Sequence, residues 1–446
     1  MTGIDIPTVE RLIAANPQDG GAWSALGVLL RRAGRSEAAA ACQFRALEHA
    51  PTQAGIWSNL GNVLTELGRH DRAVAAHARA SALAPGEPTM LFNQAIGCRK
   101  SADFAGALRA LDRLLRMAPD HVTGEWERAL TLLQTGDYAR GLPAYEVRRR
   151  IPSYRNRPVP GTPWDGRPLA GRTLFLSTEQ GFGDALLAAR FVPLLRRLAD
   201  GPGSGGSGGG RIVMECHAEQ RRLLSELPVD GTIPAGAPFP AYDAHASLMS
   251  LPWLLGATTA SLPPPVPIHV PDASREKALR LVGPPDGRRK VGIVWSGRVT
   301  FADNARRATT LDRFLRFAGV PGVRLFSLQK GPPEAQLAEL GTSALVTPLG
   351  PHFDDFADTA AVLERLDLIV MTDSSVAHLA GSLGRPVWNL VQYVPYWIYG
   401  TEADGEHTPW YPSMRLFRQG RDEDWDPVFA RVERELARFA ATGKAS

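Results

Sequence analysis

The feature that most restricts how this chain can fold is a period of 34 residues in its first third. Four prolines follow one another at that interval: Pro17, Pro51, Pro85 and Pro119. Other positions keep the same frame, because a Leu-Gly pair stands at 26–27 and again at 60–61. A fixed period of this length is typical of repeat proteins, in which each unit packs only on its neighbours.

Within each unit the apolar residues have the spacing of an amphipathic helix, as in Trp23, Leu26 and Leu30. A Gly or Ala at positions 34, 68, 102 and 136 separates two helices, and the proline closes the unit. From about residue 18 to residue 150 the pattern resembles the tetratricopeptide repeat. The resemblance implies an α solenoid over residues 1–150, with four repeats and a capping helix over residues 7–16.

Asn59 and Asn93 lie one period apart, on the first helices of two successive repeats. First helices line the concave face of such a solenoid, and this face commonly binds peptides. An amide both donates and accepts hydrogen bonds, so two stacked amides suit the main chain of an extended acceptor. We therefore predict that Asn59 and Asn93 bind an acceptor; the alternative is that both are solvated surface residues.

Prolines are concentrated in residues 151–170, which we interpret as a stiff linker. A basic run borders this linker and contains Arg148, Arg149, Arg150, Arg155 and Arg157. Its simplest interpretation is a solvated helix end, and a polyanion site is the alternative.

The rest of the chain alternates short apolar runs with helical segments, which predicts parallel sheets. The expected strands cover residues 172–177, 211–216, 290–295, 323–328, 368–371 and 387–391, and a helix is expected over 185–198. We predict two Rossmann-like lobes, residues 171–268 and 269–446, with a proline-rich hinge at 263–267. Ligands should bind between the lobes, beyond the carboxyl ends of the strands.

Residues 373–381, Asp-Ser-Ser-Val-Ala-His-Leu-Ala-Gly, follow an expected strand and open a helix. Free N–H groups at the helix start, the hydroxyls of Ser374 and Ser375, and His378 one turn later would suit a diphosphate. The alternative is an ordinary N-cap with a packed histidine. The chain has neither a complete dinucleotide-binding fingerprint nor a P-loop motif.

Residues 373–388 resemble the donor-phosphate motif of the family 9 (heptosyltransferase-like) glycosyltransferases. Five more segments resemble this group in the same order: 179–184, 291–297, 327–331, 355–361 and 410–417. The whole layout is similar to bacterial proteins that join tetratricopeptide repeats to such a domain, and more distantly to the protein O-GlcNAc transferases. The resemblance implies a GT-B fold, a nucleotide-sugar donor in the C-terminal lobe, and no cofactor or essential metal.

The donor-binding residues are expected at the strand ends of the C-terminal lobe. Arg298 follows one expected strand and Lys330 the next, and cations there would neutralise a leaving diphosphate. For both, the alternative is a solvated side chain. The complete predicted donor set is Ser296, Gly297, Arg298, Lys330, Asp373, Ser374, Ser375 and His378.

Asp184 is the predicted catalytic base. In the resembled enzymes the Gly-Asp at this place supplies the carboxylate that takes the acceptor proton. The alternative is a helix cap. Glu179 and His245 are reserves, and His245 is assigned to acceptor binding because residues 242–245 fit a family segment that borders the cleft. The chain departs from its repeat-bearing relatives at residues 394–400, whose aromatic side chains would either stack on the donor or pack the lobe.

The composition of the chain limits the kinds of partner and the location that we expect. The formal net charge is only +4 over 446 residues, which gives weak evidence for nucleic acid, and we predict no nucleic-acid partner. The three cysteines form no metal-binding or disulfide pattern. No apolar run is long enough to span a membrane, so we expect a cytoplasmic protein.

Together these features predict a glycosyltransferase that moves a sugar from a nucleotide-sugar to a protein or peptide held by the repeats. A Ser or Thr hydroxyl is the expected acceptor group, with flagellin or another surface protein as the acceptor class by analogy with relatives. Two alternatives stay open. One is a heptosyltransferase-like enzyme acting on lipopolysaccharide or another glycan, and the other is a non-catalytic repeat scaffold.

Overall fold

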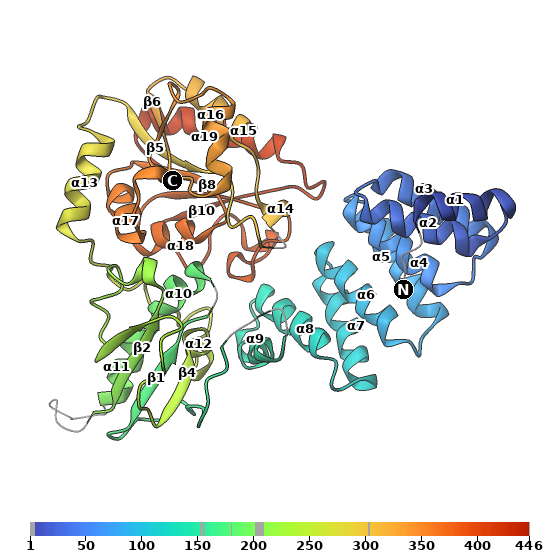
Figure 1. Cartoon of the computed structure of the whole chain (residues 1–446), viewed down its shortest axis with the longest axis horizontal. Helices are drawn as coiled ribbons and strands as arrows, with labels where there is room; N and C mark the ends of the chain where they lie inside the picture. Colours follow the sequence, from blue (N-terminus) through green and yellow to red (C-terminus); the bar gives the residue numbers. More distant parts are fainter. Residues whose placement is uncertain are drawn as a thin grey trace. The chain divides into compact units, whose positions relative to one another are not determined.

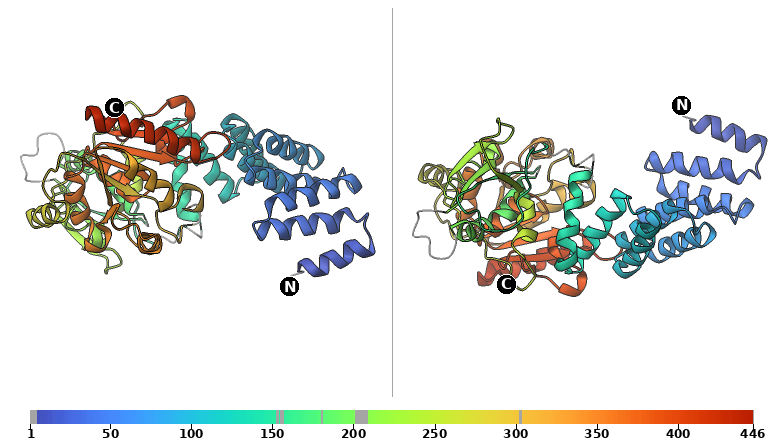
Figure 2. Two further views of the ribbon diagram at one scale, coloured as in Figure 1. Left: turned by 90° about the horizontal axis from the view of Figure 1, so that it is seen from above. Right: turned by 90° about the horizontal axis from the view of Figure 1, so that it is seen from below.

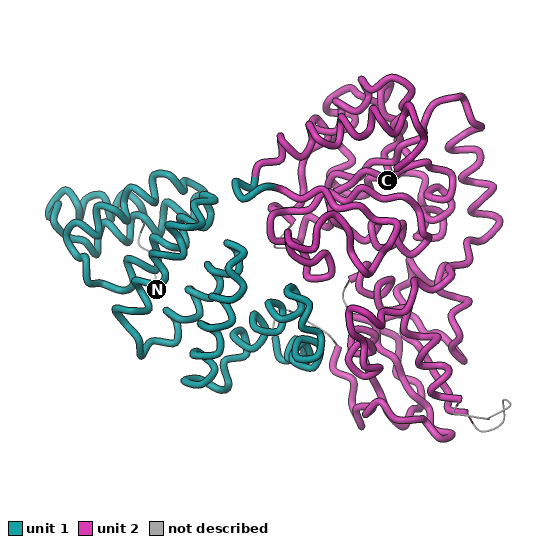
Figure 3. Tube along the Cα trace, turned by 180° about the vertical axis from the view of Figure 1, so that it is seen from behind, with its two compact units in different colours: residues 1–151, 420–423 teal, residues 152–419, 424–446 magenta. Residues whose placement is uncertain are grey.

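A computed structural model describes residues 5–151, 154, 157–179, 181–200, 209–301 and 304–445. The chain divides into two compact units (Figure 3): residues 1–151 with 420–423, and residues 152–419 with 424–446. The predicted order of helical repeats followed by an α/β region with parallel sheets is confirmed. Within the described ranges, no helix has the length and apolar character needed to cross a membrane.

The first unit is a run of helices in which each packs against the next (Figures 1 and 2). They are α1 (Ile6–Ala15), α2 (Gly20–Arg32), α3 (Ser36–His49), α4 (Ala54–Glu66), α5 (His70–Leu83), α6 (Pro88–Lys100), α7 (Phe104–Met117), α8 (Val122–Gln134) and α9 (Tyr138–Tyr145). Helix α1 is the expected capping helix, and Asp5 caps it by accepting a hydrogen bond from the backbone N–H of Thr8 (3.0 Å). The remaining helices form four pairs, one for each repeat.

The residue between the two helices of each repeat has a left-handed backbone. The φ angle is 73° at Gly34, 67° at Gly68, 61° at Ala102 and 79° at Gly136. Glycine adopts this conformation without steric cost, whereas the Cβ of Ala102 crowds the neighbouring carbonyl. The small residue that recurs in the sequence therefore meets a backbone requirement, and one of the four turns is strained.

An imidazole is buried inside the first unit. His77 of α5 lies between Gly61 of α4 and Gly97 of α6, and a Cβ on either glycine would overlap the ring. Within the described part of the chain neither ring nitrogen has a hydrogen-bond partner, and burial lowers the pKa of His77 to about 4. One repeat earlier, Gln43 occupies the same position and forms two hydrogen bonds with Ser24 (2.9 and 3.0 Å).

The basic run at the end of the repeats forms ion pairs within the chain. Arg148 is buried, and its Nη1 lies 2.5 Å from Glu146 Oε1. Arg150 pairs with Glu125 (3.0 Å). Arg155 lies outside the described residues. Arg148 is not solvated, because it is buried and paired with Glu146. Arg150 is exposed, as expected for a solvated helix end, and Glu125 balances its charge.

The second unit begins with a parallel sheet in the order β3-β2-β1-β4. Its strands are β1 (Thr173–Ser177), β2 (Arg211–Cys216), β3 (Gly231–Pro234) and β4 (Ala244–Ser247), and its helices are α10 (Phe182–Ala189), α11 (Val192–Asp200) and α12 (Leu251–Leu254). The single helix expected over 185–198 is wrong, because α10 and α11 are separate. Pro193 has no N–H to bond to the Ala189 carbonyl and its ring would clash there, so α10 ends at Ala189.

A larger parallel sheet follows, in the order β10-β9-β8-β5-β6-β7. Its strands are β5 (Arg289–Val294), β6 (Val323–Ser327), β7 (Val346–Pro348), β8 (Leu368–Thr372), β9 (Val387–Val391) and β10 (Met414–Arg418). Its helices are α13 (Asp272–Val282), α14 (Asn304–Arg307), α15 (Leu311–Leu315), α16 (Gln336–Glu339), α17 (Phe356–Glu364), α18 (Ser375–Ser382) and α19 (Asp426–Thr442). The core of this lobe is built from the strands, Phe314, Phe317 and Phe429.

Side chains also join the two lobes of this unit. Arg222, which follows β2, donates two hydrogen bonds to Asp355 (2.7 and 2.8 Å) and one to Asp358 (3.1 Å) at the start of α17. The rings of Phe182 and Phe356 lie 5.1 Å apart. The two sheets are thus the Rossmann-like lobes of one unit.

The strained turn generates the first prediction. Ala102→Gly removes the crowded Cβ and should raise the local stability of the third repeat by about 1 kcal/mol. Gly34→Ala is the matched control, because a Cβ there would meet no atom within 4 Å and only the backbone is tested. This control should destabilise its repeat by a similar amount. Hydrogen-exchange protection of the flanking helices in the full chain measures both, and unchanged protection in Ala102→Gly would contradict the strain.

The buried imidazole predicts a loss of stability in acid. Below pH 6.5 an unfolded imidazole takes up a proton, whereas folded His77 does so only near pH 4. The free energy of unfolding should therefore fall by about 2 kcal/mol between pH 7 and pH 5 on account of this group. His77→Gln, which copies Gln43, should remove that loss. Protection of the α5 amides in both chains at both pH values tests this, and equal losses would contradict it.

Candidate functional site

Two helix starts meet where strands of the two sheets end. Helix α10 follows the carboxyl end of β1, α18 follows the carboxyl end of β8, and the two helices pack on each other. Gly183 of α10 lies against the ring of His378 in α18. A Cβ on Gly183 would lie 2.7 Å from His378 Cδ2, so the lobes can meet this closely only over a glycine.

Asp184 lies in the first turn of α10 and is half-buried. Its Oδ1 accepts a hydrogen bond from the hydroxyl of Tyr396 (3.4 Å), which belongs to the connection after β9 in the other lobe. The N-cap of α10 is Gly181 rather than Asp184. The structure therefore places the predicted base at the junction of the lobes, and its catalytic role stays a prediction.

Asp373 is neutralised inside the fold. Its Oδ1 accepts a hydrogen bond from the hydroxyl of Tyr399 (2.8 Å), and Arg307 Nη1 donates to its Oδ2 (3.2 Å). The guanidinium of Arg307 also lies 4.6 Å from the centre of the Phe301 ring. Asp373 thus positions Arg307 and Tyr399 beside α18. Two tyrosines of the 394–400 stretch donate hydrogen bonds to carboxylates: Tyr396 to Asp184 and Tyr399 to Asp373.

The amides at the start of α18 are partly used within the chain, because the backbone N–H of Ala377 donates to the carbonyl of Ser374 (3.0 Å). Ser374 is the N-cap, and its hydroxyl accepts a hydrogen bond from the backbone N–H of Val376 (3.4 Å). Ser375 is the first helical residue and is half-buried. A cap satisfies only part of the free N–H groups of the first turn, so capping by Ser374 and anion binding are compatible.

His378 is a packed, neutral histidine. It is buried, and its Nδ1 shares a hydrogen bond with the hydroxyl of Tyr411 (3.1 Å). Burial lowers the pKa of His378 to about 4, so the ring carries no charge at neutral pH. The ring of His378 could contact a donor diphosphate and form a hydrogen bond with it, but it could not supply a positive charge.

Arg190 joins the lobes and was not identified from the sequence. It lies in the break between α10 and α11, and only 2% of it is exposed. Its Nη1 donates to the carbonyl of Trp410 in the other lobe (2.7 Å), and its guanidinium lies 4.8 Å from the centre of the Tyr411 ring. The sequence feature that could have pointed to Arg190 is its place within the otherwise apolar run 185–195.

Gln329 holds the strand ends of the donor lobe and was also missed as a functional residue. Its Oε1 accepts hydrogen bonds from the backbone N–H groups of Trp295 (3.1 Å) and Ser296 (3.0 Å), and its Nε2 donates to the carbonyl oxygens of Ser296 (3.0 Å) and Lys330 (3.1 Å). The loops that carry Ser296, Gly297 and Lys330 are therefore fixed to each other by one buried amide.

Arg298 and Lys330 have different surroundings. Arg298 is exposed, and its guanidinium lies 5.7 Å from the centre of the Phe182 ring at the start of α10. Lys330 is exposed as well, but its ammonium donates to the carbonyl of Phe353. Arg298 thus approaches the first residue of α10. Their donor contacts stay predictions.

The two predicted acceptor amides lie in the repeats and are linked to serines. Asn59 Nδ2 donates to Ser24 Oγ (3.2 Å), and Asn93 Nδ2 donates to Ser58 Oγ (2.9 Å). Each hydrogen bond joins the first helix of one repeat to the first helix of the repeat before it. We call these two links the Ser–Asn ladder. Both amides are half-buried, so they are more than solvated surface residues.

His245 and Glu179 have structural surroundings. His245 lies within β4, is paired in register with Phe175, and packs its ring edge-on against Tyr242 (6.3 Å). Glu179 is buried and accepts a hydrogen bond from the hydroxyl of Ser247 at the end of β4. Neither residue belongs to α10 or α18, the two helices that meet at the junction of the lobes.

Comparison with known proteins finds similarities to both parts of the chain. Tetratricopeptide repeat models match residues 6–54, 56–91 and 93–154, which confirms the repeats. Protein FlbA of Caulobacter vibrioides is 28% identical over 326 residues, covering 68% of this chain and 53% of FlbA, so the chain spans about half the length of this curated relative.

Similar solved structures include a family 9 glycosyl transferase from Veillonella parvula (14% identity, TM-score 0.43, 57% and 88% of the two chains covered). Another is the E. coli ADP-heptose LPS heptosyltransferase II (15% identity, TM-score 0.43, 61% and 99% covered).

The contact between the lobes predicts a coupling between two residues. Gly183→Ala should lower the free energy of unfolding by about 1–3 kcal/mol, because the new Cβ displaces the His378 ring. In a His378→Ala background the same substitution should cost less than about 0.5 kcal/mol, since the ring is absent. Gly231→Ala is the control, because a Cβ at Gly231 would meet no atom within 4 Å. Urea unfolding of the full chain measures all four variants, and equal costs in both backgrounds would contradict the contact.

Proposed function

We propose that this chain is a glycosyltransferase that moves a sugar from a nucleotide-sugar donor to a hydroxyl of a protein or peptide. The observation that carries the proposal is the contact between the first turns of α10 and α18. It joins the helix that carries Asp184 in its first turn to the helix whose N-terminus carries Ser374 and Ser375. The family 9 resemblance, which rests partly on residues 179–184 and 373–388, falls on these same two turns.

On the donor side, the proposal assigns a diphosphate to the start of α18. The first-turn amides carry partial positive charge. Asp373 balances the charge of Arg307 beside them (3.2 Å), so the exposed Arg298 would supply the cation. When the bond between the sugar and the diphosphate breaks, negative charge grows on the leaving oxygen, and these groups would stabilise it.

On the acceptor side, Asp184 is the proposed general base. The acceptor oxygen forms a bond to the anomeric carbon, its proton passes to Asp184, and the nucleoside diphosphate leaves with the electron pair of the broken bond. The hydrogen bond from Tyr396 to Oδ1 (3.4 Å) would hold the carboxylate in position for this proton transfer.

The repeats are proposed to dock the protein or peptide acceptor. The amide nitrogens of Asn59 and Asn93 donate to serines within the solenoid. Their carbonyl oxygens are the atoms that would accept hydrogen bonds from the main chain of the acceptor. Substitution of these asparagines should therefore weaken acceptor binding more than donor binding.

The proposal predicts separable effects on binding and transfer. Asp184→Asn should lower the rate of sugar transfer by about 10²–10⁴-fold, because an amide cannot take the acceptor proton. Donor binding should persist, since the proposed diphosphate site lies on the other lobe. Glu219→Gln, which changes an exposed carboxylate of the same lobe, is the control. Thermal shifts with UDP, GDP, ADP and CMP identify the nucleotide first, because a ligand of the native state raises the melting point.

Transfer is then measured with the matching nucleotide-sugars and a peptide pool rich in Ser and Thr, by the mass added to the peptides. If Asp184→Asn transferred sugar at the wild-type rate, Asp184 would not be the general base. Sugar added only to a glycan acceptor would favour the lipopolysaccharide alternative. If no nucleotide shifts the melting point and no transfer occurs, the chain is a scaffold and the proposal is wrong.

A further inference from the structure

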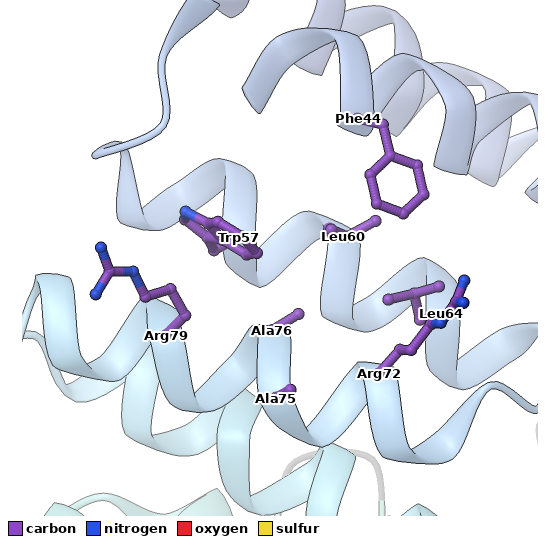
Figure 4. A pocket seen from close by; sticks show the side chains of 8 residues that line it. All are labelled: Phe44, Trp57, Leu60, Leu64, Arg72, Ala75, Ala76 and Arg79. Atoms are coloured by element: carbon purple, nitrogen blue, oxygen red, sulfur yellow. The ribbon is translucent and has the colours of Figure 1, made fainter. Parts of the chain in front are cut away.

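The repeat unit has an apolar groove that the proposed sugar transfer does not use. The groove lies over α4, between α3 and α5, and has a volume of about 440 Å³ (Figure 4). Trp57, Leu60 and Leu64 of α4 form one wall, and Phe44 of α3 extends over it. Phe44 is 45% exposed, so its ring is accessible at the edge of the groove.

The groove has a fixed shape. The indole N–H of Trp57 donates to the carbonyl of Pro51 (2.8 Å), which holds the ring in place. Ala75 of α5 is too small to fill the space opposite. The position 34 residues after Phe44 is Ala78, so the repeat frame does not require an aromatic residue there. Phe44 is therefore a feature of this one groove rather than of every repeat.

Two cations lie at opposite ends of the groove. Arg72 and Arg79 are seven residues apart on α5, which places them on the same face and about 10 Å apart along the helix. Both are exposed, and neither forms an ion pair with any carboxylate that the structure describes. In contrast, the nearby Arg69 is paired with Glu37 (2.8 Å). Unpaired cations on either side of an apolar floor are complementary to carboxylates on either side of an apolar side chain.

This groove is separate from the face that carries the Ser–Asn ladder. Successive residues of an α-helix are about 100° apart. Asn59 is therefore about 200° around α4 from Trp57, whereas Leu60 and Leu64 are within about 60° of it. A partner in the groove would leave Asn59 and Asn93 accessible.

We propose that this groove docks an acidic amphipathic segment of a partner protein. Large apolar side chains of that segment pack among Phe44, Trp57 and Leu64, and its carboxylates pair with Arg72 and Arg79. The inference does not rest on the proposed sugar transfer, because docking needs neither a donor nor the α/β unit's chemistry. It gives the repeats a second recognition surface, with a partner that need not be the sugar acceptor.

A peptide selection tests the proposal while the partner itself is still unidentified. A random peptide library is selected on the full chain and counter-selected on the double variant Arg72→Glu/Arg79→Glu. We expect the selected peptides to carry Asp or Glu within one helical turn of large apolar residues. The dissociation constant of the best peptide, measured by fluorescence anisotropy, should rise at least about tenfold in the double variant and also in Phe44→Ala.

Arg113→Glu is the matched control, because Arg113 is exposed on α7, one period after Arg79. It should change the dissociation constant less than about twofold. Circular dichroism shows whether the charge reversals disturb folding. If they do, Phe44→Ala still tests the groove, because it changes no charge. Selected peptides without acidic residues, or equal binding to wild type and Phe44→Ala, would overturn the proposal. So would a wild-type dimer that dissociates in the double variant, because the occupant would then be a second copy of the chain.

Discussion

The α/β unit depends on the place where a glycine lets an imidazole lie against a helix backbone. Gly183 has no side chain, and the ring of His378 occupies the volume that a Cβ would fill. Through this contact the first turns of α10 and α18 come together, and each turn carries polar groups at its start. Arg190 reinforces the junction from the other end of α10 by donating to the Trp410 carbonyl (2.7 Å). The relation of Asp184 to Ser374 and Ser375 is therefore a consequence of packing.

The charges near this junction are largely balanced within the fold. Asp373 is paired with Arg307 and receives a hydrogen bond from Tyr399, and His378 is neutral because burial lowers its pKa to about 4. What is left for a ligand is the partial charge of helix amides and the exposed Arg298. Such a site offers directional hydrogen bonds more than net charge, which is what favours an anion of defined geometry.

Much of the fold was predictable because it is encoded locally. The 34-residue period gave the helix pairs, and the recurring small residue marked the left-handed turns, although the strain at Ala102 needed the backbone angle. Apolar runs located most strands, within one or two residues. Pro193 is the residue in the sequence that accounts for the break in the helix expected over 185–198. The strands β3, β4, β7 and β10 were not predicted, and the short strands β3 and β7 lack an apolar run that sequence periodicity could identify.

The candidate site was predictable only in part, because its contacts join residues that are far apart in the chain. The motif at 373–381 correctly placed a helix start after a strand. It did not show that Asp373 is engaged by Tyr399 and Arg307, or that Gln329 ties two strand ends together. Periodicity reports which face of an element is apolar, but it does not report which distant side chain shares a hydrogen bond.

The Ser–Asn ladder also determines how the solenoid responds to load. At its first rung, Ser24 receives a hydrogen bond from Asn59 and donates one to Gln43, so three helices are tied at one hydroxyl. At the second rung Asn93 reaches Ser58, but the residue that corresponds to Gln43 is His77, whose ring nitrogens form no hydrogen bond within the described residues. The joint between the first and second repeats is consequently held by more hydrogen bonds than the joint between the second and third, and it should resist a pulling force better.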